Sequence, residues 1–407
     1  MKLYSFELGR VTELCLAELI SLFGEKNLVE RVRRSVFFNL EPLGIKPSDI
    51  QKLQDKLGGT IKIAEVLDSF PLKSEEPKIK IKKSLENILT NEFKDHAGSK
   101  IIFALSTVNI PADSKVFLKF FLNFSKVFLK SLGKSSRFVN KPWQNPTPAQ
   151  IYKSRAIEKG IDITILGGET NLYITKTLSI QNIDAYSYRD FDKPFRDAKM
   201  GMLPPKLAQI MINLAEPSLT HPCKTIFDPF CGSGTILMEA LLQGKKAIGG
   251  DIDQVAVDGT MKNLNWLVEN FANTGSDFTV SQKDAKDIGA KDLPSTPVDA
   301  IVSETHLGPS LSKPPSKELS NTIFQELTDL HGSWLPKAAK LIPEKGKIVI
   351  CLPSFRISKD KYESFPNLEK ILKSSGLKKI SSFVYDREDQ VVGREIIVTG
   401  RAQEKES

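Results

Sequence analysis

The sequence predicts an α/β protein in which an open, mostly parallel sheet forms the C-terminal half and two smaller α+β units precede it. Three observations predict this fold. Helix-like and strand-like segments alternate from Lys206 onward, which is typical of a parallel sheet with helices on both faces. A glycine-rich turn joins a short apolar strand to a helix within residues 225–244. Residues 1–70 show the order β-α-β-β-α-β, which is typical of a ferredoxin-like unit.

The first predicted domain covers residues 1–70. Apolar residues recur at strand or helix spacing along it. The pattern predicts strands at 2–8, at 29–40 (as a pair or as one long strand) and at 60–67, and helices at 12–24 and 47–58. Residues 68–82 are rich in proline and charge, so we interpret them as a linker.

The second predicted domain covers residues 83–181. Strands are predicted at 100–108, 161–168 and 171–181, and helices at 114–132 and 147–159. The first of these helices is amphipathic, because phenylalanines recur at helical spacing on one stripe: Phe117, Phe120, Phe121, Phe124 and Phe128. A polar connector over residues 182–205 leads to the third domain, at 206–401.

Basic residues are concentrated in one short segment. The 407 residues carry a net charge of +8, and residues 101–160 hold ten Lys or Arg against two acids, Asp113 and Glu158. This segment therefore accounts for the whole excess, and we interpret it as the part that binds a polyanion. The alternative is a solvated helix face next to a core tryptophan. The candidate phosphate contacts and one stacking aromatic are Lys115, Lys119, Lys126, Lys130, Arg137, Lys141 and Trp143.

Cysteine usage and hydropathy exclude several classes of protein. The four cysteines form no CxxC pair and no metal-ligand spacing with the four histidines, so we expect neither a disulfide scaffold nor a metal site. Charges interrupt the N-terminus before an apolar run develops, which argues against a signal peptide. The most apolar helical stretch, 115–132, contains four lysines, so no membrane span is expected. We predict a soluble, cytoplasmic protein.

The glycine-rich turn is a candidate ligand site. Residues 225–235 read TIFDPFCGSGT, and Gly232 and Gly234 permit a positive φ and a close approach of the backbone to a ligand. The following strand ends at Asp251, at the spacing where an acid binds the hydroxyls of a ribose.

Three ligand interpretations of this turn were weighed. A dinucleotide is disfavoured because Leu237 replaces the third glycine of the fingerprint and because Asp228 would repel a pyrophosphate. A ligand with an ammonium group and no phosphate fits better, and S-adenosylmethionine is such a ligand. The remaining alternative is an ordinary glycine turn without a ligand.

The loop DPFCGSGT resembles the cofactor loop of Rossmann-fold RNA methyltransferases that carry an N-terminal THUMP domain. The resemblance is above all to the tRNA guanosine-10 N2-methyltransferases and their bacterial relatives. Residues 195–215 resemble that family's connector and first catalytic helix, and residues 385–398 resemble its closing strands. The resemblance implies a class I methyltransferase domain with a mostly parallel seven-stranded sheet at 206–401, and a THUMP-like RNA-binding domain at 83–181.

The resemblance also implies which residues bind the cofactor, S-adenosylmethionine. Asp228 and the backbone of Gly232 and Gly234 would hold its methionine part, Asp251 its ribose and Asp284 its adenine amine. A solvated turn acid is the alternative for Asp284, and Asp287 competes with it for the same role. The implied cofactor set is Asp228, Phe230, Gly232, Gly234, Thr235, Asp251, Ile252, Asp284 and Ala285.

The candidate catalytic residues follow the strand predicted at 298–302. At this point the family has Asp or Asn, two prolines and an aromatic residue, or Glu-Pro-Tyr, whereas this sequence has Ser303-Glu304-Thr305-His306. The resemblance implies that the Glu304 carboxylate accepts a hydrogen bond from an exocyclic amine and that the His306 ring stacks on a base. Ser303 belongs to the same catalytic set. Thr305 replaces a proline, which predicts a less rigid turn.

The resemblance implies an S-adenosylmethionine-dependent RNA methyltransferase that acts on the N2 amine of a guanosine in tRNA. A monomer is expected, and a small activator subunit stays an open possibility. One alternative is a catalytically inactive RNA-binding protein of the same fold, favoured by Thr305 and His306. Another is a DNA amino-methyltransferase, disfavoured by the THUMP-like unit. A cysteine nucleophile is not expected, because Cys231 lies in the cofactor loop and Cys351 ends a strand.

Overall fold

The computed structural model describes residues 2–110, 113–196, 202–272, 274–293, 297–309, 311–358, 361–386 and 390–402. The chain divides into two compact units. The first consists of Met1–Thr12, Phe23–Lys56 and Thr60–Ile183, and the second of Glu13–Leu22, Leu57–Gly59 and Asp184–Ser407.

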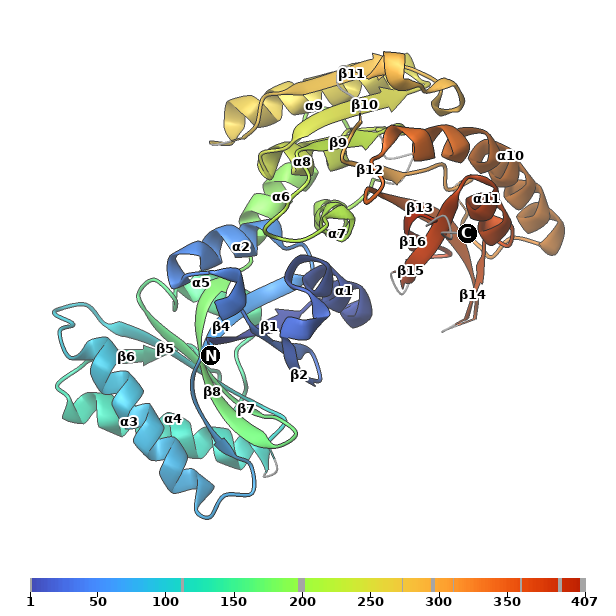
Figure 1. Cartoon of the computed structure of the whole chain (residues 1–407). Coiled ribbons are helices and arrows are strands. Elements are labelled where there is room, and N and C mark those ends of the chain that lie inside the picture. Colours follow the sequence, from blue (N-terminus) through green and yellow to red (C-terminus); the bar gives the residue numbers. More distant parts are fainter. Residues whose placement is uncertain are drawn as a thin grey trace. The chain divides into compact units, whose positions relative to one another are not determined.

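The first unit is built on one eight-stranded sheet. Its strands run in the order β2-β3-β1-β4-β8-β7-β5-β6, and the two halves join where β4 pairs with β8 in antiparallel orientation (Figure 1). The strands are β1 (Leu3–Leu8), β2 (Leu28–Val32), β3 (Ser35–Asn39), β4 (Thr60–Pro71), β5 (Ile101–Val108), β6 (Ser136–Phe138), β7 (Gly160–Gly167) and β8 (Asn171–Ile180). The segment predicted as one strand or two at 29–40 is therefore a pair.

Helices connect these strands along the chain. They are α1 (Thr12–Phe23), α2 (Ile50–Lys56), α3 (Pro77–Phe93), α4 (Ser114–Ser131) and α5 (Pro148–Ser154), although most of α1, Glu13–Leu22, belongs to the second unit. The predicted phenylalanine stripe of α4 is confirmed: Phe117 and Phe121 are buried in a core with α3 and the sheet, and the other three phenylalanines pack against it half-buried.

Two sequence-based boundaries were wrong. The linker predicted at 68–82 contains the end of β4 and the first turn of α3, because Pro77 sits in the first turn of a helix, where its missing N–H costs nothing. The helix predicted at 147–159 ends at Ser154, since Arg155 adopts a left-handed φ of 59°. The connector at 182–205 contains a helix, α6 (Ile183–Phe191).

The second unit is a doubly wound α/β structure. Its sheet runs β11-β10-β9-β12-β13-β16-β15, with β14 paired to β13. The first five strands are parallel, and β16 runs antiparallel to both of its neighbours, so the sheet is mixed. The strands are β9 (Thr225–Asp228), β10 (Lys246–Asp251), β11 (Phe278–Gln282), β12 (Ala300–Glu304), β13 (Lys347–Ser358), β14 (Lys361–Ser364), β15 (Leu377–Tyr385) and β16 (Val392–Arg401).

Helices cover both faces of this sheet. Phe227, Ile301 and Ile348 share a core with side chains of α10 and α11. α8 packs between α7 and α9, and α8 and α9 lie against β10 while α7 lies against β12 and β13 (Figure 1). The α-helices after α6 are α7 (Pro205–Ala215), α8 (Thr235–Leu242), α9 (Gln254–Asn270), α10 (Lys317–Leu341) and α11 (Leu368–Ser374). Among the described residues, no helix is long and apolar enough to cross a membrane.

Candidate active site

The candidate site lies where β9 and β12 end. Counted from β9, the parallel strands run 3-2-1-4-5, so the order reverses between β9 and β12, and ligands of such sheets bind at the carboxyl ends beside this point. β9 ends at Asp228 and β12 at Glu304. The hydroxyl of Ser303 donates to Oδ1 of Asp228 across 2.6 Å. The predicted cofactor acid and the predicted catalytic segment therefore meet in one place.

Asp228 is a buried carboxyl group, 1% exposed. Its Oδ1 also accepts a hydrogen bond from the backbone N–H of Phe230, at 3.1 Å. Burial raises the pKa of Asp228 to about 7, and the charges of Asp251 and Glu304 act in the same direction. Asp228 is thus poised to ionise when a cation lies beside it.

The glycine loop has the geometry of a ligand cradle. Gly232 and Gly234 have φ values of +53° and +78°. A Cβ added to Gly232 would meet no side chain within 4 Å, whereas a Cβ added to Gly234 would lie 2.8 Å from Cγ2 of Thr260. One glycine therefore leaves room on the open side of the loop, and the other lets the loop pack against α9. Oδ2 of Asp251 accepts the N–H of Gly232 at 2.9 Å, so the predicted ribose acid also holds the loop.

Two side chains of α9 bind carbonyl groups of this loop. Thr260 donates its hydroxyl to the Gly232 carbonyl at 2.7 Å, and the Asn263 amide donates to the Ser233 carbonyl at 2.8 Å. Asn263 also bonds both the N–H and the carbonyl of Phe195. Sequence reasoning missed both residues. The signal that could have found them is that polar side chains recur on the apolar, buried face of a helix.

The remaining members of the predicted cofactor set surround the loop. Phe230 packs edge-on against Trp334, with ring centroids 5.3 Å apart. Thr235, at the start of α8, accepts a hydrogen bond from the buried amine of Lys193 at 3.1 Å. Ile252 is 64% exposed.

The two acids that compete for the adenine amine lie in one turn after β11. Asp284 caps this turn by accepting the backbone N–H of Lys286 at 2.8 Å, and Ala285 beside it is buried. Asp287 lies 3.7 Å from the amine of Lys337. Both carboxylates thus have partners of their own within the chain.

Glu304 is held by a basic side chain that the sequence analysis did not select. Arg394, on β16, donates its Nε–H to Oε1 of Glu304 across 2.6 Å. Burial raises the pKa of Glu304, and the Arg394 guanidinium opposes that rise. Cys351 is fully buried with its pKa raised by desolvation, so it is a poor nucleophile.

The turn after Glu304 is restrained differently from the prediction. The replacement of a proline by Thr305 predicts a less rigid turn, but Thr305 is 3% exposed and donates both its N–H and its hydroxyl to the carbonyl of Cys351, at 3.2 and 3.0 Å. These two hydrogen bonds fix the turn without a proline. His306 follows in an exposed position.

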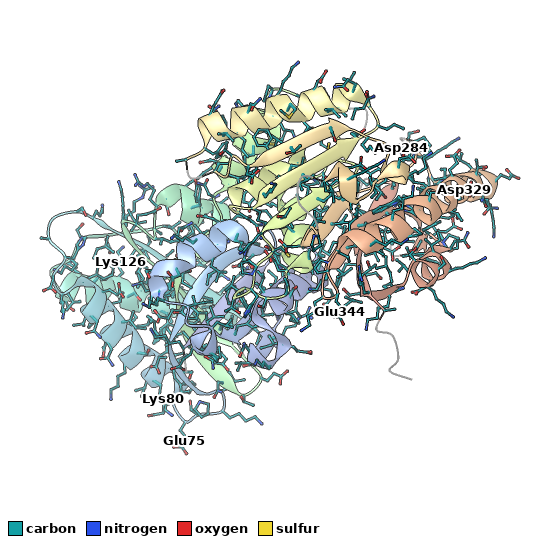
Figure 2. The ribbon with its side chains drawn as sticks, turned by 45° about the horizontal axis from the view of Figure 1, so that its top comes forward. Glu75, Lys80, Lys126, Asp284, Asp329 and Glu344 are labelled. Atoms are coloured by element: carbon teal, nitrogen blue, oxygen red, sulfur yellow. The ribbon has the colours of Figure 1, made fainter. Side chains whose placement is uncertain are left out.

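In the first unit, the candidate RNA-binding residues are on the surface. Six basic residues and Trp143 are exposed: Lys115, Lys119, Lys126, Lys130, Arg137, Lys141 and Trp143. The amine of Lys119 lies 4.7 Å from the centroid of the Trp143 ring, and Trp143 is 40% exposed at a φ of 59°. The alternative of a core tryptophan is therefore wrong. Figure 2 shows Lys126 of α4 and Lys80 of α3 extending from the first unit.

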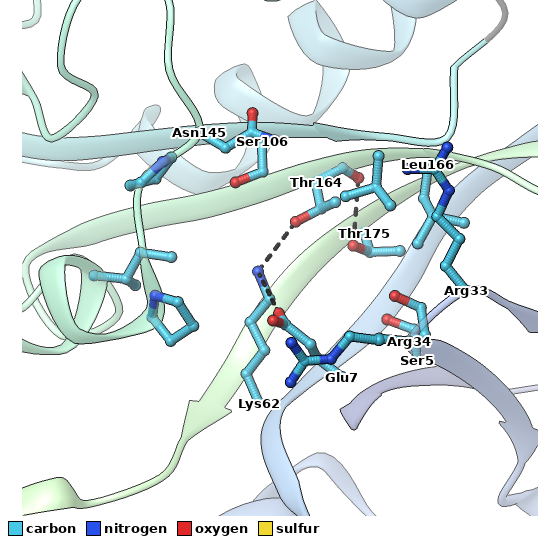
Figure 3. Close-up of a pocket in the computed structure, with 15 residues that line it drawn as sticks. Ser5, Glu7, Arg33, Arg34, Lys62, Ser106, Asn145, Thr164, Leu166 and Thr175 are labelled. Atoms are coloured by element: carbon cyan, nitrogen blue, oxygen red, sulfur yellow. Dashed lines mark hydrogen bonds and ion pairs between the residues drawn. The ribbon is translucent and has the colours of Figure 1, made fainter. Parts of the chain in front are cut away.

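A polar cavity of about 240 Å³ also lies in the first unit, against the sheet (Figure 3). Lys62 stands in it, with its amine 3.2 Å from Oδ2 of Asp162 and 3.2 Å from the hydroxyl of Thr164. The Arg34 guanidinium donates to the Leu8 carbonyl at 2.7 and 3.0 Å. Both of these cations therefore have partners within the chain.

Comparison with known proteins places the second unit among methyltransferases. A family model described as the RMKL-like methyltransferase domain matches residues 193–354. The chain is 36% identical over 155 residues to the tRNA (guanine(10)-N2)-dimethyltransferase of Methanothermobacter thermautotrophicus, covering 38% of this chain and 40% of that protein.

One further relative and one solved structure are also similar to this chain. The probable tRNA (guanine(10)-N2)-dimethyltransferase of Methanothermococcus thermolithotrophicus is 35% identical over 127 residues, 31% of this chain and 72% of that protein. The crystal structure of TrmN from Thermus thermophilus superposes with a TM-score of 0.49 and 16% identity, covering 98% of this chain and 99% of that one. The chain spans less than half the length of the first two curated relatives it matches.

Proposed function

The chain belongs to the family of the tRNA (guanine(10)-N2)-dimethyltransferases, and we propose that it transfers a methyl group from S-adenosylmethionine to the exocyclic N2 amine of a guanosine in tRNA. The observation that carries this proposal is the hydrogen bond from Ser303 to Asp228, which joins the end of β9 to the end of β12, where Glu304 is the next residue. One acid beside the glycine loop suits a cationic cofactor, and the other suits an amine.

The residues around the loop fit S-adenosylmethionine. Gly232 leaves open space where a side chain would stand, and the buried Asp228 offers a carboxylate to the cofactor's ammonium group. The Asp251 carboxylate accepts hydrogen bonds from backbone N–H groups, and its remaining lone pairs would bind the ribose hydroxyls. Ile252 would lie against the adenine ring, and Asp284 would accept a hydrogen bond from the adenine amine. When bound, the cofactor supplies a methyl group on a positively charged sulfur.

Glu304 would orient and deprotonate the amine. Its carboxylate accepts a hydrogen bond from the N2 group, which turns the nitrogen lone pair toward the methyl group. Once nitrogen carries the new substituent it must lose a proton, and the same carboxylate accepts it. His306, exposed after the turn, would stack on the target base.

We assign the first unit to tRNA binding. In this proposal residues 1–70 form the ferredoxin-like domain and residues 83–181 the THUMP-like domain, followed by the connector at 182–205 and the Rossmann-fold methyltransferase domain at 206–401. The exposed lysines of α4 and the exposed ring of Trp143 support the assignment, because they offer phosphate contacts and a stacking surface. We expect a cytoplasmic monomer.

The test is incubation of the protein with total tRNA and labelled S-adenosylmethionine, followed by nucleoside mass spectrometry. The proposal predicts N2-methylated or N2,N2-dimethylated guanosine. Isothermal titration with the cofactor separates the main alternative, an inactive RNA-binding protein favoured by the altered segment Thr305-His306. Absence of cofactor binding at millimolar concentration would favour that alternative, and methylation of DNA instead of tRNA would favour a DNA amino-methyltransferase.

A further inference from the structure

Arg394 reaches Glu304 from a strand that is not its neighbour. Glu304 pairs with Cys351 of β13, and Arg394 pairs with Pro353 of the same strand from the other side. The arginine side chain therefore crosses β13 to bond a carboxylate on β12. The two side chains are only 7% and 18% exposed, which makes this a largely desolvated pair. A buried guanidinium needs such a partner.

We propose that Arg394 is a positioning residue for methyl transfer, which occupies Oε1 of Glu304 and leaves Oε2 to accept the hydrogen bond and then the proton of the substrate amine. This inference rests on the proposed function. It names the group that selects which carboxylate oxygen faces the substrate.

The hydrogen bonds divide the two oxygens of Glu304 clearly. Arg394 donates to Oε1 at 2.6 Å, and the thiol of Cys351 lies 3.9 Å from the same oxygen. Within the described part of the chain, no group bonds Oε2. One oxygen is thus anchored to the sheet, and the other stays available at the end of β12, where the crevice opens.

The surrounding charges explain why an arginine is needed. Among the described residues, the titratable and charged groups that interact with Glu304 include Asp228 at the end of β9, Cys351 on β13 and Arg394 on β16. Burial raises the pKa of Glu304, and the nearby carboxyl of Asp228 does not favour a second negative charge. Arg394 is the cation in this set, and it lowers the pKa of Glu304 against the effect of burial, which favours the ionised form that can take a proton.

Arg394 is also fixed from a second direction. Its Nη2 lies 3.5 Å from the carbonyl oxygen of Met202, in the segment that leads into α7. A planar guanidinium with two separate acceptors has little freedom to rotate. Lysine carries the same charge but cannot form both contacts in one plane. Arg394→Lys should therefore restore the ionisation of Glu304 more fully than the orientation of its carboxylate.

The test compares Arg394→Ala and Arg394→Lys with the wild type in tRNA methylation. We expect Arg394→Ala to lower kcat by about 100-fold with the KM for S-adenosylmethionine unchanged within about twofold, because only the orientation of the amine and the proton acceptor is lost. The acid limb of the kcat profile should move to higher pH in Arg394→Ala. In Arg394→Lys the limb should return toward its wild-type position while kcat stays reduced.

Arg401→Ala is the matched control. Arg401 lies on the same strand and donates to the carbonyl groups of Ala339 and Ile342, away from Glu304. It should lower Tm without moving the pH profile. If Arg394→Ala behaves like this control, with a lower Tm and an unchanged kcat and acid limb, Arg394 has a purely structural role and the inference is overturned.

A second readout does not depend on activity. The carboxyl carbon of Glu304, labelled selectively with 13C and assigned by the loss of its signal in Glu304→Gln, reports the ionisation of that group directly. Its titration midpoint should rise in Arg394→Ala. An unchanged midpoint overturns the role of Arg394, whereas a wild-type protein that modifies no tRNA overturns the proposed function alone.

Discussion

Asp228 and Glu304 are two buried acids that face the same crevice with different partners. Asp228 is bonded by a hydroxyl and a backbone N–H, both neutral donors. Glu304 is bonded by a guanidinium. A neutral donor stabilises a carboxylate less than a cation does, so a cationic ligand would supply Asp228 with the kind of partner that Glu304 already has in Arg394. The proposed roles, cofactor binding and proton acceptance, follow this difference.

Replacing Glu304 by Gln should abolish most methyl transfer. The amide keeps the shape and one acceptor oxygen but cannot take a proton, and general-base contributions are typically 10²–10⁴-fold, so kcat should fall by about that factor. Isothermal titration should show unchanged cofactor binding. Transfer at the wild-type rate in this variant would remove Glu304 from the mechanism.

Cofactor binding should strengthen with pH around neutrality. With a pKa of about 7, the ionised fraction of Asp228 rises roughly eightfold between pH 6 and pH 7.5, so the Kd for S-adenosylmethionine should fall by up to that factor over this range. Asp228→Asn should bind weakly with little pH dependence. Equal slopes for the two proteins in calorimetric titrations would contradict the role of Asp228.

At the scale of secondary-structure elements, the glycine loop depends on α9. Thr260 and Asn263 bind two loop carbonyls, and Gly234 lets α9 approach because it has no Cβ. The loop N–H groups are bonded as well: Gly232 donates to Oδ2 of Asp251 and Gly234 to the carbonyl of Cys231. The helix therefore fixes the shape of the cradle.

Gly234→Ala should weaken cofactor binding and stability together. Its positive φ costs an alanine about 1–2 kcal/mol, and the new Cβ would press on Thr260. Gly244→Ala is the matched control, since Gly244 has a φ of +72° with open space around it. Both variants should lose free energy of unfolding in urea titrations, but only Gly234→Ala should raise the Kd for S-adenosylmethionine. A raised Kd in both would point to general loosening.

A buried acid on α1 makes the second unit sensitive to pH. Glu18 accepts the N–H groups of Gly58 and Gly59 and the amide of Asn213 on α7, and all of these residues belong to that unit. Burial raises the pKa of Glu18 to about 7. The folded protein therefore binds more protons than the unfolded chain between pH 4.5 and 7, and stability falls as pH rises through this window.

Glu18→Gln should flatten this part of the stability profile. The expected change is up to about 3 kcal/mol between pH 4.5 and 7, read as the pH dependence of the difference between the wild type and the variant in urea unfolding. Glu25→Gln, at an exposed position in the first unit, is the control and should leave the profile unchanged. A constant difference across the window would show that Glu18 does not titrate there.

At the scale of the whole molecule, charge and chemistry are separated. The net +8 matches the excess carried by residues 101–160, all in the first unit, whereas Asp228, Glu304 and the glycine loop lie in the second. Phosphate contacts give affinity without sequence information, and the chemistry needs a dry, ordered crevice. In the proposed function, these two demands fall on different parts of the chain.

Binding of tRNA should fall steeply with salt. Each lysine that releases a counterion contributes roughly 0.7–0.9 to the slope of log K against log salt, so changing Lys119 and Lys126 to Gln should reduce the slope by about 1.4–1.8. The same change at Lys340 and Lys345, exposed in the second unit, should leave it unaltered. A flat salt dependence for the wild type would refute the phosphate-binding role of α4.

The sequence by itself determined the local features of this protein. Spacing and residue type predict the strand–glycine loop–helix motif with its acids Asp228 and Asp251. They also predict the phenylalanine stripe of α4 and the order of the elements. The boundaries of elements were predicted less accurately. Pro77 suggested a linker, but a helix accepts proline in its first turn, and α3 begins at this residue.

Only the tertiary structure decided which distant residues act together. Arg394 lies 90 residues from Glu304, and Ser303 lies 75 from Asp228; these pairs exist because strand order places their strands in one sheet. Thr305 illustrates the same point, since its two bonds to Cys351 restrain a turn that residue type predicts to be loose. Spacing reports contacts within an element, whereas the pKa and orientation of a side chain depend on groups that packing brings to it from elsewhere in the chain.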